Sequence, residues 1–148
     1  MTPLNLPQTQ LRLTRKDGVI SVFCAVRKKK LVLTPEEWVR QHLIAYFVEV
    51  LEISIGRMGA EVSIEYNGRK KRADILVVDD FGKPFILVEC KAPEIPISGS
   101  TFFQISAYQK KLPAKILVLS NGLEHVVINL DSQNPKTSSE LEVMKEWI

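Results

Sequence analysis

Two apolar runs joined by a short turn constrain most strongly how this chain can fold. Residues 75–78 read Ile-Leu-Val-Val and residues 85–88 read Phe-Ile-Leu-Val. Such runs of β-branched and aromatic residues are typical of buried strands. The six residues between them, 79–84, contain Gly and Pro and predict a turn. We therefore expect two neighbouring strands connected as a hairpin.

Ionisable residues lie at the ends of both runs, where a buried strand is normally apolar. Asp74 precedes the first run, and Glu89 and Lys91 follow the second. Side chains alternate between the faces of a strand, so Glu89 and Lys91 share one face, and the hairpin brings Asp74 within reach. A structural cluster of ion pairs is one interpretation. A divalent-cation site for phosphodiester chemistry is favoured, because buried ion pairs rarely add stability over apolar residues.

The rest of the chain predicts further strands and helices. Residues 11–33 indicate β structure around a hairpin with its turn at 16–18, and Thr34 is a typical N-cap before Pro35. Apolar residues then recur at helical spacing to about Ile55. The remaining expected elements are strands at 61–66, 69–78, 85–91, 115–119 and 124–130, a helix at about 98–112, a loop at 131–139 and a short closing helix.

This order of elements predicts an α/β fold with a mixed central β-sheet flanked by helices, plus an N-terminal β-hairpin. The strand–helix–strand step over residues 85–119 should form a right-handed crossover between parallel strands, and the hairpins add antiparallel neighbours. The length of 148 residues suits a single domain. We expect residues 1–33 to be a hairpin extension, 34–131 the core, and 132–148 a loop and C-terminal helix.

Composition excludes several classes of protein. The net charge of +3 is too small to indicate nucleic-acid binding by itself, although basic residues cluster at 27–30 and 69–72. The two cysteines match no metal-ligand spacing, and no signal peptide or membrane-spanning run is visible, so we expect a reduced, cytoplasmic protein without membrane contact. No phosphate-binding loop of an ATP motor occurs.

The motifs resemble a known family. Asp74 followed by Glu89-Cys90-Lys91 resembles the D…(D/E)-x-K signature of the PD-(D/E)xK nuclease superfamily. The wider pattern is similar to the N-terminal nuclease domain of type I restriction enzyme R (HsdR) subunits, and implies a restriction-endonuclease-like core. The segments that carry this likeness, over about residues 35 to 130, are 35–40 (PEEWVR), 71–75 (KRADI), 88–93 (VECKAP), Gln104 with Tyr108, and 119–122 (LSNG).

The resemblance implies a Mg²⁺-dependent endonuclease that hydrolyses double-stranded DNA. Asp74, Glu89 and the backbone carbonyl of Cys90 would bind Mg²⁺, with Mn²⁺ as a substitute, and Lys91 would lie beside the attacking water. A separately encoded helicase, specificity or methylation subunit is an expected partner. The alternative is a catalytically silent nuclease-fold module that binds DNA or a protein partner.

The resemblance also implies supporting residues in the two helices. Glu36 lies four residues before Arg40 and on the inward face of its helix, so it is preferred to Glu37, which we expect on the surface. Gln104 and Tyr108 lie one helical turn apart and are expected to support the site or contact a DNA phosphate. Without the upstream motif, an ordinary amphipathic helix would be the preferred explanation of these two residues.

The basic cluster at 69–72 immediately precedes Asp74. Alternation places Lys70 and Arg72 on the same face as Asp74, so these two are the expected contacts to the DNA backbone. The alternative is a solvated hairpin tip. We interpret the other basic run, residues 27–30, as an exposed loop.

Overall fold

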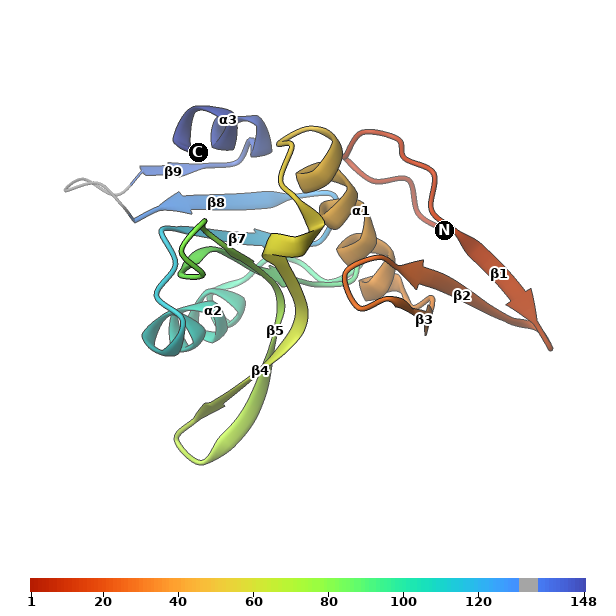
Figure 1. Ribbon diagram of the computed structural model, residues 1–148, viewed down its shortest axis with the longest axis horizontal. Helices are drawn as coiled ribbons and strands as arrows, with labels where there is room; N and C mark the ends of the chain where they lie inside the picture. The colour runs from red at the N-terminus through yellow and green to blue at the C-terminus, as the bar shows by residue number, and fades with distance from the viewer. Residues whose placement is uncertain (131–135) are drawn as a thin grey trace.

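The computed structural model describes residues 1–130 and 136–148, apart from the side chains of Tyr66, Tyr108 and residues 101–104. Its strands form two sheets, one of order β1-β2-β3 and one of order β4-β5-β6-β7-β8-β9 (Figure 1). The strands are β1 (Leu13–Lys16), β2 (Val19–Cys24), β3 (Lys29–Val32), β4 (Met58–Tyr66), β5 (Arg69–Val78), β6 (Pro84–Cys90), β7 (Ile116–Ser120), β8 (His125–Asn129) and β9 (Lys136–Ser138). The helices are α1 (Pro35–Glu49), α2 (Gly99–Lys111) and α3 (Met144–Trp147), with 3₁₀ turns η1 (Ile55–Arg57) and η2 (Leu141–Val143).

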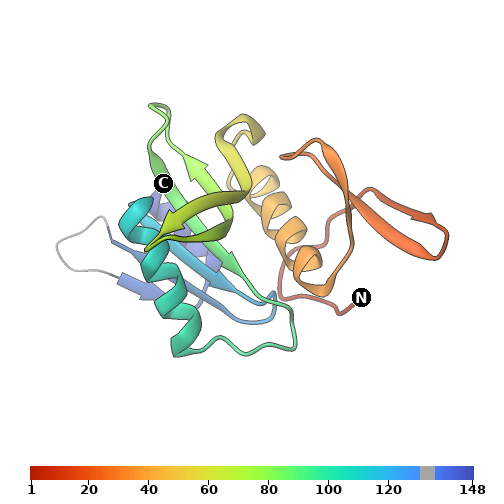
Figure 2. The same cartoon turned by 90° about the horizontal axis from the view of Figure 1, so that it is seen from below.

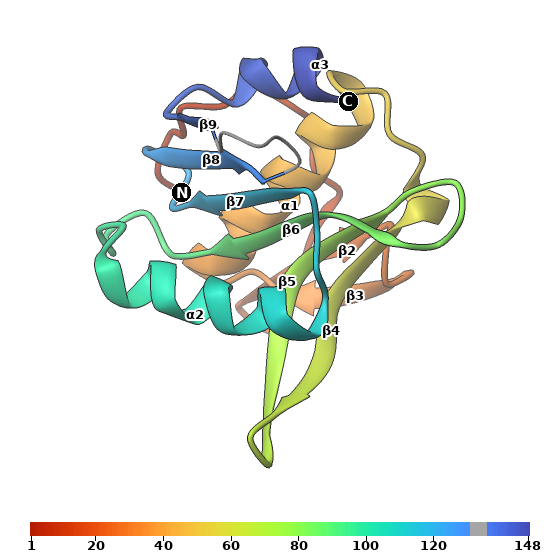
Figure 3. The same cartoon turned by 90° about the vertical axis from the view of Figure 1, so that its left-hand side faces the viewer.

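The larger sheet is mixed and lies between helices, as the order of elements predicted. β6 and β7 are parallel, and α2 connects them, whereas the other neighbouring strands are antiparallel. The views in Figure 3 and Figure 2 show α1 and α2 on opposite faces of this sheet. Within the described residues, no helix has both the length and the apolar character needed to cross a bilayer.

Each face of the larger sheet has its own apolar layer. Leu43 and Phe47 of α1 pack with alternate residues of β5 and β6, including Ile75 and Val88. On the other face, Ile105 of α2 packs with the intervening residues of the same strands and of β7. The β5–β6 hairpin is therefore covered on both sides, which explains its continuous apolar sequence.

The smaller sheet lies on the other side of α1 from the larger sheet (Figure 2). The expected hairpin of β1 and β2 is present, and β3 adds a third antiparallel strand. Val22 and Cys24 of β2 are fully buried, and Cys24 belongs to the same apolar layer as Leu43. The N-terminal region is thus anchored to the core by apolar side chains.

The first helix is shorter than its apolar periodicity predicted. It ends at Glu49 instead of about Ile55. Glu52 has a positive φ of 55°, and this turn directs the buried side chains of Leu51 and Ile53 into the core. Tertiary packing of these two residues replaces a further helical turn, and β4 then begins at Met58, three residues before the predicted start.

The C-terminal region contains a strand where a loop was predicted. Lys136–Ser138 forms β9 at the edge of the larger sheet and pairs antiparallel with β8, whereas residues 131–135 lie outside the described part of the chain. β9 has no buried apolar residue, so no alternation in its sequence marks it as a strand. The predicted closing helix is present as η2 and α3.

Candidate active site

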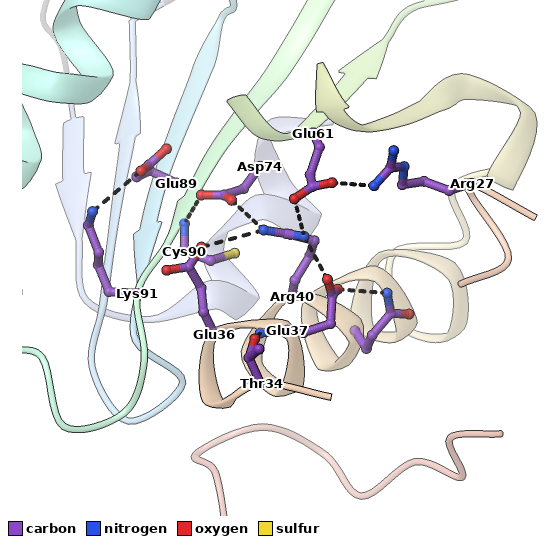
Figure 4. A network of polar contacts seen from close by, with 11 residues as sticks. Arg27, Thr34, Glu36, Glu37, Arg40, Glu61, Asp74, Glu89, Cys90 and Lys91 are labelled. Carbon is purple, nitrogen blue, oxygen red and sulfur yellow. Dashed lines mark hydrogen bonds and ion pairs between the residues drawn. The ribbon is translucent and has the colours of Figure 1, made fainter. Parts of the chain in front are cut away.

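Two carboxylates meet where β6 ends. The β5–β6 register pairs Ile75 with Val88, and one further step places Asp74 opposite Glu89. Both residues are buried, with relative exposures of 6% and 3%. The backbone N–H of Cys90 donates a hydrogen bond of 2.7 Å to Asp74 Oδ2, which holds the Asp74 carboxylate at this end of the strand (Figure 4).

The carboxyl group of Glu89 is strongly desolvated. Among the described residues, no donor reaches its buried Oε2 atom. Burial and, secondly, the negative charge of Asp74 raise the pKa of Glu89 to about 9, and Lys91 offsets this only in part. Without a cation, Glu89 therefore holds a proton at neutral pH. A buried polar atom without a partner is costly, so this oxygen needs an explanation beyond stability.

Lys91 lies beside Glu89, as the strand alternation predicts. Its Nζ atom is 3.6 Å from Glu89 Oε1, and its side chain is partly exposed, at the border between the buried carboxylates and solvent (Figure 4). Cys90, between them, is fully buried in the apolar layer beneath α1, and burial raises the pKa of its thiol well above the ordinary value. A protonated, inaccessible thiol provides no nucleophile here.

A buried arginine from α1 organises the carboxylates. Arg40 Nη2 donates a hydrogen bond of 2.7 Å to Asp74 Oδ1, and Nη1 donates one of 2.8 Å to Glu37 Oε1. Nη1 also lies 3.3 Å from Glu61 Oε1. Burial lowers the pKa of Arg40, but the negative charges of Asp74 and Glu37 raise it by more than burial lowers it. The net shift is upward, so the guanidinium stays charged. Arg40 thus connects α1, β4 and β5.

The sequence interpretation of Glu37 was wrong. It predicted a surface residue, but the Glu37 side chain is buried, and it also accepts a hydrogen bond of 3.0 Å from Gln41. Glu37 lies three residues before Arg40, and this helical spacing turns both side chains toward each other. The predicted N-cap is present, because the Thr34 hydroxyl accepts from the backbone N–H of Glu37.

Glu61 is a member of the site that the sequence interpretation did not identify. The β4–β5 register runs from Tyr66–Arg69 to Ala60–Ile75 and places Glu61 opposite Asp74. Glu61 has a positive φ of 51° and forms ion pairs with Arg40 and with Arg27 (Figure 4). The Asn67-Gly68 turn is the sequence signal that could have identified Glu61, because counting outward from it along both strands places Glu61 opposite Asp74.

Glu36, which the sequence placed on the inward face of its helix, lies at the solvent side of the same cluster, because Glu37 takes the inward position beside Arg40. Its Oε1 atom is 3.5 Å from Arg40 Nη2, and its side chain is 44% exposed. Partial burial and, secondly, the charge of Asp74 raise the pKa of Glu36. A cleft of about 490 Å³ borders the arginine side of this cluster. Its lining includes Glu36, Glu37, Arg40 and Glu61 but not the described side chains of Asp74, Glu89 and Lys91, and it continues to Leu31, Val32, Ala92 and Glu94.

The other predicted residues are not gathered at the carboxylates by any described contact. Lys70 and Arg72 are exposed on the β4–β5 hairpin, which extends away from the sheet (Figure 1). The backbones of Gln104 and Tyr108 belong to α2, but their side chains lie outside the described part of the structure. A contact of these four residues with the site therefore stays a prediction.

The donor set fits a Mg²⁺ ion. Mg²⁺ prefers carboxylate oxygens and keeps several waters, so it commonly uses only one or two carboxylates of a protein. Asp74 and Glu89 supply two, including the partnerless Glu89 Oε2, and each carboxylate oxygen can accept more than one contact. Within the described ranges, no three His, Cys, Asp or Glu side chains are grouped closely enough to form a metal cage by themselves. An ion with a largely hydrated shell is therefore a better match than a fully enclosed one.

A family model matches most of this chain. The sequence model described as "Type I restriction enzyme R protein N terminus (HSDR_N)" matches residues 35–145, a span that includes Asp74, Glu89 and Lys91. Residues 1–34 lie outside the match. No curated protein matches the chain.

Two solved structures are similar to parts of this chain. A fragment of a candidate HsdR subunit of a type I restriction enzyme from Vibrio vulnificus YJ016 has a TM-score of 0.44 and 23% identity, over 57% of this chain. This chain spans only 18% of that protein. A candidate nuclease of the DUF820 group from Anabaena variabilis ATCC 29413 has a TM-score of 0.48 and 14% identity, over 91% of this chain and 80% of its own.

Proposed function

This chain belongs to the family of type I restriction enzyme R protein N-terminal domains, and on that premise we propose that it is a Mg²⁺-dependent DNA endonuclease. The observation that carries the proposal is the buried Glu89 carboxyl group. It has a partnerless oxygen, a raised pKa, a second carboxylate opposite it and a lysine beside it. A cation would take the place of the proton on Glu89, because its positive charge offsets the repulsion that would otherwise arise between two ionised carboxylates.

Each residue has a distinct role in this proposal. Asp74, Glu89 and the backbone carbonyl of Cys90 would hold Mg²⁺, for which Mn²⁺ could substitute. When bound, the ion supplies a water of lowered pKa and offsets negative charge on the phosphate. Lys91 would orient the attacking water and donate a hydrogen bond to the phosphate as its charge grows. Arg40 would be a positioning residue, because it touches Asp74 and not the reacting atoms.

The family also supports a proposal for the substrate and the partners. We propose double-stranded DNA as the substrate, with Lys70 and Arg72 as backbone contacts and Gln104, Tyr108 and Glu36 as supporting residues. A separately encoded helicase, specificity or methylation subunit would act with the chain in the cytoplasm. These proposals rest on the resemblance as well as on the exposed position of Lys70 and Arg72.

One observation favours the alternative, a silent module that binds without cutting. Both oxygens of Asp74 already accept hydrogen bonds, one from Arg40 and one from the Cys90 backbone. An arginine in this position partly substitutes for the positive charge of a metal ion. In a silent module, this ion pair would stabilise the fold, and DNA or a protein would be bound without hydrolysis.

A plasmid-cleavage assay separates the two functions. Purified protein is incubated with supercoiled and linear DNA in Mg²⁺, Mn²⁺ or a chelator, beside Asp74→Asn, Glu89→Gln and Lys91→Ala. The matched controls are Glu124→Gln and Lys83→Ala, which remove exposed charges elsewhere. We expect metal-dependent cutting that falls by about 10²-fold or more in the three site variants only. Equal cutting by all proteins would refute the assignment, and metal-independent binding without cutting would support the module.

A further inference from the structure

Positive charge is concentrated in the region that precedes the family match. Residues 1–34 contain seven of the 20 basic residues and one of the 17 acidic residues, which gives a net charge of +6. The remaining residues, with 13 basic and 16 acidic side chains, carry −3. The nuclease-like core is thus acidic, and the whole positive excess of the protein lies around the smaller sheet. An acidic core repels a polyanion unless another element attracts it.

We propose that the β1–β3 sheet is the surface that binds the phosphate backbone of duplex DNA and holds the duplex at the candidate active site. This inference rests on the proposed function for its substrate. It assigns the main binding energy to an element outside the matched residues 35–145 and not to Lys70 and Arg72 alone. The sheet becomes a dedicated substrate-binding extension.

The basic side chains of this sheet are available to a ligand. Six of the seven are exposed, namely Arg12, Arg15, Lys16, Lys28, Lys29 and Lys30. Within the described part of the chain, Lys28, Lys29 and Lys30 form no ion pair. Lysines without an acidic partner can neutralise phosphates and release counterions, which favours binding without reading the base sequence.

One arginine next to the sheet contacts an aromatic ring of β2. The guanidinium carbon of Arg12 lies 4.8 Å from the centroid of the Phe23 ring, and the backbone carbonyl of Arg12 accepts a hydrogen bond from the Phe23 N–H. This cation–π contact extends the basic surface from β3 across β2 to the segment before β1. A restrained arginine loses less entropy when it contacts a phosphate.

The position of β3 connects this surface to the candidate active site. Leu31 and Val32 line the same cleft as Glu36 and Arg40.

A chain of ion pairs is a second connection. The residue before the three lysines, Arg27, forms an ion pair with Glu61. Because Glu61 also contacts Arg40, which binds Asp74, a chain of charged contacts joins the β2–β3 turn to the paired carboxylates (Figure 4). A duplex held by β3 therefore lies next to the cleft.

A salt titration of binding tests the proposal without any cleavage. The triple variant Lys28→Gln/Lys29→Gln/Lys30→Gln is compared with Lys83→Gln/Lys136→Gln/Lys145→Gln, which removes three exposed lysines from other elements. Fluorescence anisotropy measures the Kd of each full-length protein for a labelled duplex of about 20 base pairs in chelator, from about 50 to 200 mM salt. We expect the β3 variant to bind about 10- to 100-fold more weakly, with a salt slope smaller by about 2 to 3. The control should change less than about threefold.

The outcomes distinguish this inference from the proposed function. Equal weakening by the two triple variants, or none in the β3 variant, overturns the inference even if the wild type cuts DNA. A wild type that binds only RNA or an acidic protein, and no duplex DNA, also overturns it. Binding that depends on β3 without any cutting would sustain the inference and refute the nuclease. Circular dichroism verifies folding, and Arg15→Gln/Lys16→Gln on the exposed β1–β2 turn supplies a second variant.

Discussion

Replacing Glu89 with glutamine is expected to stabilise the metal-free protein at neutral pH. In the folded protein, burial and the adjacent Asp74 raise the pKa of Glu89 to about 9, against 4.5 for an ordinary glutamate. At a pH between these two pKa values, Glu89 is protonated in the folded state and ionised in the unfolded state. Stability from this group is therefore fully present below pH 4.5 and is lost as the pH rises toward about 9. Glutamine has nearly the same shape and needs no proton.

The magnitude follows from the proton taken up on folding. At about pH 7.5, folding must protonate a carboxyl group whose unfolded pKa of 4.5 lies about three units lower. At about 1.4 kcal/mol per unit, this costs about 4 kcal/mol, provided that the folded pKa stays above the working pH. The lost contact with Lys91 reduces the benefit of the substitution. We expect Glu89→Gln to raise the free energy of unfolding by about 2 to 4 kcal/mol.

Urea unfolding in chelator, followed by tryptophan fluorescence, measures this difference across pH. The gap between Glu89→Gln and wild type should be small near pH 5 and should widen by roughly 1.4 kcal/mol per unit up to about pH 9. The exposed control Glu124→Gln should show no such widening. If the two stability curves run parallel, or if Glu89→Gln is less stable than wild type near pH 8, Glu89 is ionised in the folded protein. This result would refute the conclusion that burial and the adjacent Asp74 keep Glu89 protonated in the folded protein.

Three further predictions concern the same cluster. Mg²⁺ should bind the wild type more tightly as the pH rises toward about 9 and should release a proton, because the cation displaces the proton of Glu89. Calorimetry in buffers of different ionisation enthalpy would detect the released proton. The same heat of binding in every buffer would contradict this prediction. Arg40→Met should lower the free energy of unfolding by about 3 to 5 kcal/mol in urea, since it leaves buried Asp74 and Glu37 uncompensated, and a cost below about 1 kcal/mol would count against the network. Lys91→Ala should leave Mg²⁺ affinity within about threefold while DNA cleavage falls by about 10²-fold or more, so a parallel loss of both would assign Lys91 to metal binding instead.

The residues at the centre of the site could be predicted because their placement depends on local geometry. Strand alternation put Glu89 and Lys91 on one face, and the hairpin brought Asp74 opposite Glu89. Counting residues outward from the Asn67-Gly68 turn in the same way places Glu61 opposite Asp74. These relations need only the two-residue period of a strand and the length of a turn.

Errors arose where long-range packing overrides a local pattern. The end of α1 was misplaced, because burial of Leu51 and Ile53 outweighs continued helical periodicity. β9 was missed, because pairing with β8 requires no apolar side chain. Glu37 was assigned to the surface, because first-turn acidity is usually solvated and nothing in its sequence neighbourhood reports burial.

By itself, the sequence determined the α/β order of elements, the positions of the hairpin turns and the identity of the paired carboxylates with their lysine, since all three depend on contacts between near neighbours in the chain. Only the tertiary structure decided how strongly these groups are perturbed. Arg40 reaches Asp74 from a helix 34 residues away, and the depth of burial sets the raised pKa of Glu89. It also decided that the basic β1–β3 sheet lies beside this site, because apolar side chains such as Cys24 and Leu31 anchor that sheet against the core that includes α1.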